Sequence, residues 1–409
     1  MRRVTEPAAA RLSVDFGQMT EAFPRAVIEK ILEETDRASV RRRKLPAYLM
    51  VYYVIALGLM VSISAREVLR LLLDDVRDHL TDGAELIASR AAICKARVRL
   101  GVEPIRELFE RVVRPIAKRA TKGAWFGHLR LVALDGSSLN LQDTPANRKR
   151  YGKAAIAGKK KTSPLPLIRF VALCEIGTHV LFAVRMAAWK VSEVALAKQL
   201  IDRLEPGMLC LADRLFYGFD LWNQAVASGA ELLWRVQKKI PLPRLQMLKD
   251  GSYLSEVRAR SNAKVAVRAR RVAVRVIEFN VTVGKRREHY RVITTLLDPK
   301  KAPALELANL FARRWGIETA FGELKTYLRG RGVLLRSQRP DLVEQDFYGL
   351  LLAHFGVRCV MDEAARERNI PPTEVSFVHA VRVVIRRLPE MVSFSPLWWL
   401  PDMPSPSGC

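Results

Sequence analysis

The sequence predicts an α/β protein in which a mixed sheet flanked by helices follows an all-helical N-terminal domain and carries a β-rich insertion. Three observations support this fold class. Apolar residues recur at helical spacing over 21–122. Strand-like runs alternate with helical segments over 126–236, and arginines alternate with valines over 266–277. A chain of 409 residues is long enough for two or three domains with a buried core.

The N-terminal region, residues 1–125, is expected to be a helical module. Its first 20 residues are polar, and from about Glu21 the apolar residues follow the spacing of an amphipathic helix, as in Leu69, Leu72 and Leu73. We predict about five or six helices in this module.

Residues 45–65 carry no charge and have the length of a membrane span, with a basic cluster before them. They also contain Pro46, Gly58 and three tyrosines near one end, which favours a buried helix; a membrane-associated protein is the alternative. The polar N-terminus lacks the pattern of a secretory signal. Five scattered cysteines without a CxxC pair fit a reducing cytoplasm.

Residues 126–236 should form the first part of the sheet. In chain order they contain a strand, a hairpin, a helix, a strand, a helix and a strand. These elements are predicted at 131–135, 167–186, 192–204, 208–213, 219–227 and 231–236. The order is the one expected of a ribonuclease-H-like fold.

The second half of the chain is expected to interrupt this core and then complete it. Residues 237–289 form the β-rich insertion, and the alternation of arginine with valine gives it one strongly basic face. Residues 290–390 return to the core with a strand, a helical run over 303–328 and two closing helices over 342–364 and 373–388. Residues 391–409, rich in proline and serine, should be a loose tail.

Three acidic residues stand where a catalytic site would need them. Asp135 follows the apolar run 131–134, Asp213 follows the run 208–212, and Glu318 lies in the later helical run. Ligands of open α/β sheets bind just past the ends of strands, so we expect the aspartates to meet at the rim of the sheet. Carboxylates are the side chains that hold hard cations such as Mg2+.

The charge of the chain points to a polyanionic partner. The sequence has 68 Lys+Arg against 42 Asp+Glu, a net charge of +26. The basic residues recur in five clusters, at 41–44, 148–150, 159–161, 268–271 and 285–287. Clusters spread along a chain favour an extended phosphate-binding surface. Together with the three carboxylates, they indicate a metal-dependent enzyme that acts on phosphodiesters. A phosphate-loop ATPase is disfavoured, because five residues instead of four separate Gly152 from Gly158.

The spacing around Glu318 resembles the signature of the DDE transposases of the insertion-sequence-4 family, Tyr-x2-Arg-x3-Glu-x6-Lys. In this chain the spacing matches Phe311, Arg314, Glu318 and Lys325. Asp135 with Gly136 and Ser137, and the stretch 211–217, are similar to the same family. Phe311 is a departure, because it lacks the hydroxyl that the signature tyrosine carries.

The resemblance implies a catalytic core in which Asp135, Asp213 and Glu318 hold two Mg2+ ions when DNA is bound, with Mn2+ as a substitute. Two such ions activate the attacking oxygen and stabilise the leaving oxygen in an in-line displacement. On a regular helix Glu323 would project roughly 140° away from Glu318. We therefore expect Glu323 to lie outside the metal site and Glu323→Gln to keep most of the activity.

The resemblance also implies residues that bind the DNA. Arg314 and Lys325 would grip phosphates near the scissile bond, and Arg214 is a further candidate because it adjoins Asp213. In the family a base near the transposon end is flipped out and stacked on an aromatic ring. Tyr290 is the first candidate for that ring, and the alternatives are Trp234 and Trp315.

The function implied is a transposase that binds terminal inverted repeats of its own insertion sequence, cleaves there and joins the 3′ ends to target DNA. The helical module would recognise the double-stranded DNA ends, two protomers would assemble on two ends, and the protein would lie in a bacterial cytoplasm near the nucleoid. The alternatives are an inactive relative that binds DNA without cutting it, which Phe311 keeps open, and a ribonuclease-H-like nuclease without strand transfer.

Overall fold

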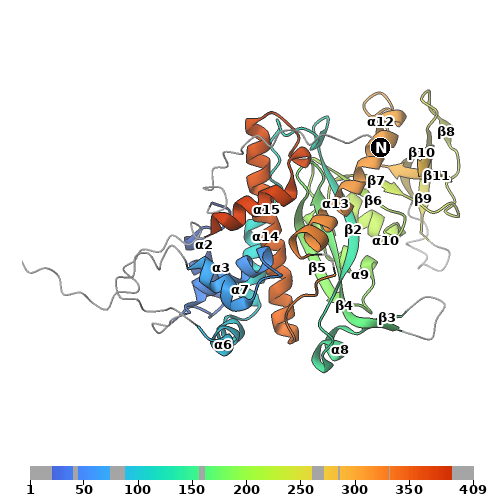
Figure 1. Ribbon diagram of the computed structural model, residues 1–409. Helices are drawn as coiled ribbons and strands as arrows, with labels where there is room; N and C mark the ends of the chain where they lie inside the picture. Colours follow the sequence, from blue (N-terminus) through green and yellow to red (C-terminus); the bar gives the residue numbers. More distant parts are fainter. Residues whose placement is uncertain are drawn as a thin grey trace, which may run out of the picture.

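The computed structural model describes residues 21–39, 45–73, 88–155, 162–259, 271–283, 286–330 and 332–388. Within these ranges one sheet runs from the predicted core into the predicted insertion, and helices cover it (Figure 1). The clusters at 41–44 and 159–161, part of the clusters at 268–271 and 285–287, the first 20 residues and the predicted tail lie outside the described residues.

Five strands form the core of the sheet, in the spatial order β5-β4-β2-β6-β7. The pairs β5–β4 and β4–β2 are antiparallel, and the pairs β2–β6 and β6–β7 are parallel. This arrangement confirms the ribonuclease-H-like fold. The strands are β2 (Leu129–Asn140), β4 (Thr162–Glu175), β5 (Val180–Ala188), β6 (Met208–Ala212) and β7 (Glu231–Arg235).

Short elements connect the core strands. The predicted helix over 192–204 is shorter than expected: Ser192 caps α9 (Glu193–Lys198) by accepting a hydrogen bond from Ala195 N, and a 3-10 turn (Ile201–Arg203) follows. The helix α10 (Phe219–Ala227) has the predicted bounds. The remaining small elements are β1 (Trp125–Phe126), α8 (Pro145–Tyr151) and β3 (Lys153–Ala155).

The insertion continues the same sheet. Its strands β8 (Gln246–Met247), β9 (Tyr253–Arg258), β10 (Arg271–Val283) and β11 (Arg286–Thr294) are antiparallel, and β11 pairs with β7 through Val292–Thr294. The sequence-based boundary between residues 289 and 290 therefore falls inside β11.

The predicted basic face of the insertion is interrupted at Arg275. This side chain is fully buried and forms an ion pair with Asp250. It also donates hydrogen bonds to Ser252 Oγ (2.8 Å) and to the carbonyl of Ala302 (2.6 Å). The segment before α12 covers it, whereas Arg271, on the same face of β10, is exposed. Alternation alone could not distinguish these two positions.

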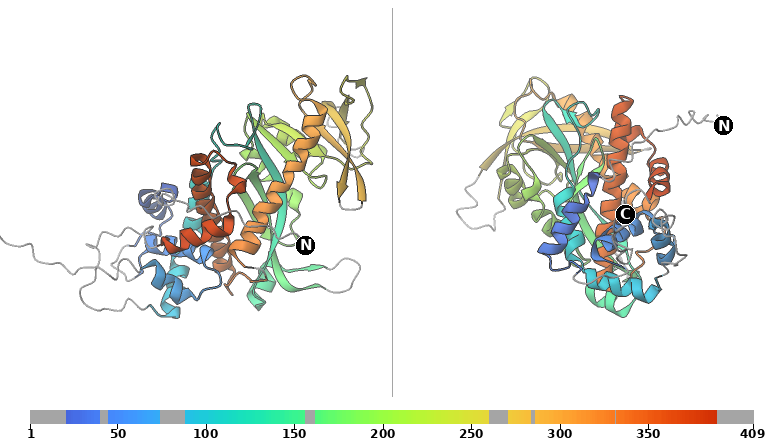
Figure 2. Two further views of the ribbon diagram at one scale, coloured as in Figure 1. Left: turned by 45° about the horizontal axis from the view of Figure 1, so that its top comes forward. Right: turned by 90° about the vertical axis from the view of Figure 1, so that its left-hand side faces the viewer.

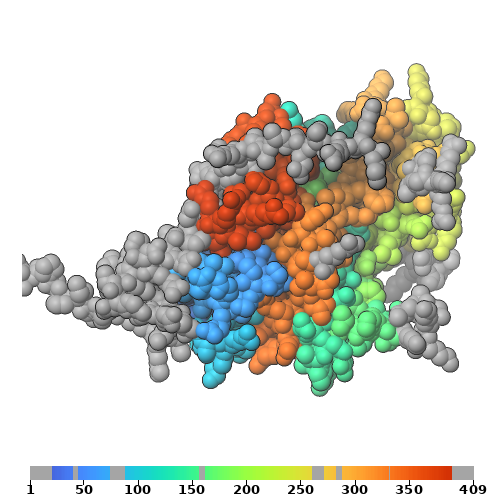
Figure 3. Space-filling view, in the orientation of Figure 1, coloured from blue at the N-terminus to red at the C-terminus, as the bar shows by residue number. Residues whose placement is uncertain are grey.

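The N-terminal module packs against the long helix α14 (Pro340–Glu367). Its described helices are α2 (Arg25–Glu34), α3 (Ala47–Leu59), α4 (Ala65–Leu72), α6 (Arg90–Leu100) and α7 (Glu103–Val112). In Figure 3 the blue surface of these helices lies directly against the orange and red surface of the C-terminal helices. Arg97 of α6 joins the two regions through a buried ion pair with Asp346 of α14, 2.7 Å long.

The charge-free segment forms the buried helix that we predicted. All residues of α3 except Tyr48 are buried, as expected of a helix that is apolar on every side. A Cβ atom on Gly58 would lie 2.6 Å from the carbonyl oxygen of Gly349, so the α3 and α14 backbones need glycine at this crossing. Within the described ranges, no helix combines the length and apolar character that crossing a membrane requires.

The helical run predicted over 303–328 is not one regular helix. It consists of α12 (Ala304–Ala312), a 3-10 turn η2 (Arg313–Trp315), α13 (Gly316–Gly322) and a π-helical turn η3 (Glu323–Leu328). Figure 2 (left) shows this orange run crossing the strands of the sheet. Ile317, Phe321, Leu324 and Leu328 are buried, which confirms the apolar stripe. The chain closes with α14, a 3-10 turn (Pro372–Glu374) and α15 (Phe377–Arg386).

Candidate active site

The strand register places Asp135 and Asp213 side by side. The last parallel pair between β2 and β6 is Leu134 with Ala212, so each aspartate is the next residue on its strand. Neighbouring strands lie about 4.8 Å apart. The expected strand end at Asp135 is wrong, because β2 continues to Asn140 through its pairing with β4. The rim exists because β6 stops at Ala212 while β2 continues.

Arg314 joins the third carboxylate to the first. Its Nη1 lies 3.1 Å from Asp135 Oδ2, and its Nη2 lies 3.5 Å from Glu318 Oε1. The Arg314 side chain is only 7% exposed, whereas Glu318 is 46% exposed. Arg314 and Glu318 are therefore more than an i,i+4 pair on a helix surface, because the arginine also holds the aspartate of β2.

The three carboxylates influence one another. Burial raises the pKa of Asp135, and the charges of Glu318 and Asp213 raise it further, against the backbone N–H of Gly136 and the guanidinium of Arg314. A negative charge at Asp135 is thus only partly compensated. A cation bound among these oxygens would relieve the repulsion.

Lys325 reaches the same strand from the far end of the helical run. Its Nζ lies 3.0 Å from the hydroxyl oxygen of Ser137. Ser137 is two residues beyond Asp135 on β2, so the two side chains share one face of the sheet. Burial lowers the pKa of Lys325, and the neighbouring Arg329 lowers it further. Arg314, Glu318 and Lys325 of the signature therefore converge on one strand.

Tyr290 adjoins the site but is not open to a base. Arg235 stacks over its ring at 3.6 Å from the centroid and also lies 3.7 Å from Asp213. Phe311 packs edge-on against Tyr290, with ring centroids 6.2 Å apart, and both aromatic residues are buried. Trp234 is fully buried, while Trp315 is 46% exposed. Of the three aromatic candidates, Trp315 is the one with an accessible ring. Arg214 is also exposed, next to Asp213.

Glu193 is a carboxylate near the site that the sequence did not reveal. It opens α9, and a Cβ atom on Gly136 would lie 2.6 Å from its Oε2. Burial raises the pKa of Glu193, and the charge of Asp135 contributes to that shift. Arg169 Nε lies 3.7 Å from Glu193 Oε1. The sequence does show Ser192 and Glu193 at the start of a helix that follows the predicted hairpin. Nothing in the sequence, however, indicates that Glu193 lies near Asp135.

The donor set suits a hard cation, although the acids are not drawn together. Over the described ranges, no three His, Cys, Asp or Glu residues stand close enough to hold a metal ion as they are. Arg314 lies between the carboxylates of Asp135 and Glu318, and Arg235 faces Asp213. Oxygen donors without cysteine or histidine are nevertheless the set that Mg2+ and Mn2+ prefer.

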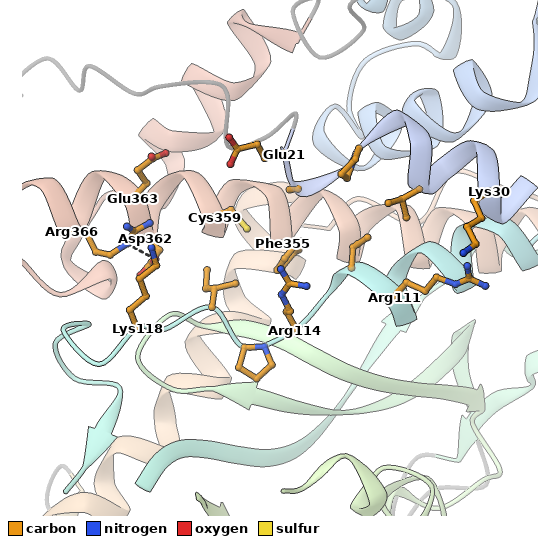
Figure 4. A pocket seen from close by; sticks show the side chains of 16 residues that line it. Glu21, Lys30, Arg111, Arg114, Lys118, Phe355, Cys359, Asp362, Glu363 and Arg366 are labelled. Carbon is orange, nitrogen blue, oxygen red and sulfur yellow. Dashed lines mark hydrogen bonds and ion pairs between the residues drawn. The ribbon is translucent and has the colours of Figure 1, made fainter. Parts of the chain in front are cut away.

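A separate cavity of about 860 Å3 lies in the helical part of the molecule (Figure 4). Residues of α2, the segment 111–118 and α14 line it, among them Lys30, Arg114 and Asp362. In Figure 4 Asp362 pairs with Arg366 at its wall. None of the three carboxylates belongs to this lining, so the cavity and the candidate active site are distinct.

Comparison with known proteins places the chain in a family. Residues 13–110 match the family described as "Insertion element 4 transposase N-terminal", and residues 127–355 match the family "Transposase DDE domain". The chain is 28% identical over 375 residues to the transposase InsG for insertion sequence element IS4 of Escherichia coli (strain K12), covering 90% of this chain and 82% of the relative. InsZ of the same strain, provisionally named a transposase, is 31% identical over 215 residues, covering 52% of this chain and 69% of the relative.

A cryo-EM structure of the piggyBac transposase synaptic complex with hairpin DNA aligns with 96% of this chain and 87% of that chain, with a TM-score of 0.45 and 11% sequence identity. The family assignment of this chain rests on the two family matches and not on this structural similarity. Since the match to the DDE domain alone spans more than half of the 409 residues, this chain belongs to the DDE transposases of the insertion-sequence-4 family.

Proposed function

We propose that this transposase binds the terminal inverted repeats of its own insertion sequence, cleaves the DNA there and joins the 3′ ends to target DNA. The observation that carries this proposal is the position of Asp135, which lies beside Asp213 in the register of β2 and β6 and is linked to Glu318 through Arg314. Divalent metal ions are general to the DDE family, and three carboxylates around one rim suit that chemistry.

Asp135, Asp213 and Glu318 would hold Mg2+, or Mn2+ in its place, with two ions present when DNA is bound. Two ions supply activation of the attacking oxygen and stabilisation of the leaving oxygen. Asp135 lies next to Asp213 on the sheet and is bridged to Glu318 by Arg314, which supports the proposal that it would serve both ions.

The cationic side chains around the rim would bind the phosphates. Arg314 is held between Asp135 and Glu318, so its guanidinium lies next to the place proposed for the scissile phosphate. Lys325 presents its ammonium beside Ser137, and exposed Arg214 follows Asp213 in the chain. These positive charges would also offset the repulsion between acidic ligands and DNA.

The rest of the proposed DNA surface is drawn from two regions. The match over residues 13–110 supports a role for the helical module in recognising the transposon ends. The net charge of +26 supports wide contact with double-stranded DNA. Two transposon ends require two active sites, so we propose a homodimer in the DNA complex and, with DNA as partner, association with the bacterial nucleoid.

The experiment uses the full chain and labelled duplex DNA that carries the inverted repeat flanking its reading frame, with Mg2+ and a target plasmid. Cleavage at the repeat and joining of its 3′ end to the plasmid are expected. Binding without cleavage would show an inactive relative, and cleavage without joining would show a nuclease. Equal action on a scrambled repeat would contradict recognition of the element's own ends.

A further inference from the structure

A buried ionic network lies beneath the helical run that carries Glu318. Its centre is Glu323, whose Oε1 lies 2.9 Å from His179 Nδ1 and whose Oε2 lies 3.1 Å from His354 Nε2. Arg358 donates to both oxygens of Glu323, with the Nε contact at 3.0 Å. The four side chains are between 1% and 7% exposed. They come from the turn after β4, the π-helical turn and α14, so the network joins three elements.

The network coincides with the irregular part of the helical run. The π-helical turn begins at Glu323 itself and ends at Leu328. Such turns are rare and accommodate an extra residue, so they change the direction of the side chains that follow. Lys325 lies within this turn and is the residue that contacts Ser137 of β2. The geometry of the turn thus decides where the Lys325 ammonium lies.

His179 holds the helical run on both sides of Glu318. Its backbone has φ = 58°, a left-handed conformation that is uncommon for a residue other than glycine. Its Nδ1 contacts Glu323, and its Nε2 would lie 3.5 Å from a Cβ atom on Gly316. The turn between β4 and β5 therefore contacts the run two residues before Glu318 and five residues after it.

We propose that this network is a positioning device for the active site: Glu323, held by Arg358, His179 and His354, fixes the π-helical turn and so places the Lys325 ammonium beside Ser137, two residues beyond Asp135 on β2. Glu323 does not touch the substrate, and it acts through Lys325. The proposal rests on the proposed function only for the step from Lys325 to DNA cleavage.

A matched control exists elsewhere in the same sheet. Glu175, at the end of β4, is also fully buried and pairs with Arg130. It accepts hydrogen bonds from Ile116 N and Ala117 N, both 3.0 Å, and from Thr178 Oγ1, 2.6 Å. None of these partners belongs to the helical run, although Thr178 precedes His179 in the same turn. Glu175→Gln therefore disturbs a buried carboxylate without removing any contact to Glu323.

The first measurement is the rate at which an amine-reactive reagent modifies Lys325, followed by mass spectrometry in wild type, Glu323→Gln and Glu175→Gln. We expect Glu323→Gln to raise the rate by about threefold or more, and Glu175→Gln to leave it unchanged. His354→Gln, which removes one contact to Glu323, should give a smaller rise and serves if Glu323→Gln does not fold. Equal rates in all variants would overturn the positioning role, whether or not the protein cleaves DNA.

The second measurement is a double-mutant cycle on single-turnover cleavage at saturating DNA. The sequence alone predicted that Glu323→Gln keeps most of the activity; because Glu323 begins the π-helical turn that carries Lys325, we now expect it to slow cleavage by about tenfold. In a Lys325→Ala background it should slow cleavage by less than about twofold, because the two residues act in series. Glu175→Gln should have the same effect in both backgrounds. An effect of Glu323→Gln that persists in full without Lys325 would overturn the proposal. Absence of cleavage in wild type would instead contradict the proposed function.

Discussion

The exposed and the buried sides of the helical run each carry a glutamate, and the two glutamates have different surroundings. Glu318 is 46% exposed and shares Arg314 with Asp135. Glu323, five residues later, is 5% exposed and contacts three basic side chains. Burial alone would raise the pKa of Glu323, but Arg358 and the hydrogen bonds with two histidines outweigh it and hold the pKa well below its usual range.

The difference lies in how completely each charge is compensated. The Glu323 charge is neutralised inside the protein, which makes Glu323 a structural anchor. On the exposed side a single arginine serves two acids, and the pKa of Asp135 is raised by burial and by its acidic neighbours. Incomplete compensation leaves the exposed acids able to bind a cation, and in the proposed function this is the side of the run that would face the DNA.

The largest expected effect is on the exposed side. Asp135→Asn, Asp213→Asn and Glu318→Gln should each slow cleavage by at least about a thousandfold, because a metal-ligating charge contributes several kcal/mol to the transition state. Binding of the transposon end, measured by gel shift on the same DNA, should be kept, since removing a negative charge reduces repulsion. Asp202→Asn and Glu306→Gln, at exposed positions away from the rim, are the controls. Any one variant that retains cleavage removes its residue from the site.

On the buried side the expected effect is on stability. Arg358→Met removes the strongest partner of Glu323 and leaves a buried carboxylate poorly compensated, which typically costs about 3–5 kcal/mol of unfolding free energy. Urea unfolding followed by circular dichroism measures this loss. Arg382→Met, at an exposed position of α15, should cost less than about 0.5 kcal/mol. Equal losses in the two variants would show that the network contributes no stability.

The pH dependence of the free energy of unfolding tests the role of Glu323 on the buried side. The folded-state pKa of Glu323 lies below its ordinary value of 4.5, so its stabilising contribution is present above that pH and is lost as the pH falls. The groups facing it are His179, His354, Arg358 and the buried thiol of Cys174. Burial lowers the pKa of both histidines below 6.5, against the opposing effect of Glu323, so their contribution also declines with falling pH.

The free energy of unfolding should therefore be compared between wild type and Glu323→Gln across this range. Their difference should be constant above about pH 5 and shrink below about 4.5. A difference that grows as the pH falls would mean that Glu323 is protonated in the folded protein.

The smallest expected effect concerns Phe311. The ring is buried against Tyr290, so Phe311→Tyr restores the signature hydroxyl in a place closed to solvent. We expect a loss of about 1 kcal/mol of unfolding free energy and a change in cleavage rate of less than about threefold. A large gain in cleavage would show that the missing hydroxyl limits this enzyme, contrary to the packing seen around Phe311.

Local patterns in the sequence were sufficient to predict a helix or strand whose position depends on its own residues alone. The strand before Asp213, the helix α10 and the buried helix α3 follow from runs of apolar residues and from caps. The sequence could not show that β2 continues past Asp135, because that depends on pairing with β4. The π-helical turn likewise depends on side chains from β4–β5 and α14, which contact Glu323 from distant parts of the chain.

We propose that the acids on the exposed side of the helical run hold the metal and that Glu323 does not. Electron paramagnetic resonance of Mn2+ added to the protein–DNA complex measures the bound ions directly. We expect up to two ions per active site in wild type and in Glu323→Gln, and weaker or incomplete binding in Asp135→Asn and Glu318→Gln. Full Mn2+ binding by Glu318→Gln together with lost binding by Glu323→Gln would contradict the account.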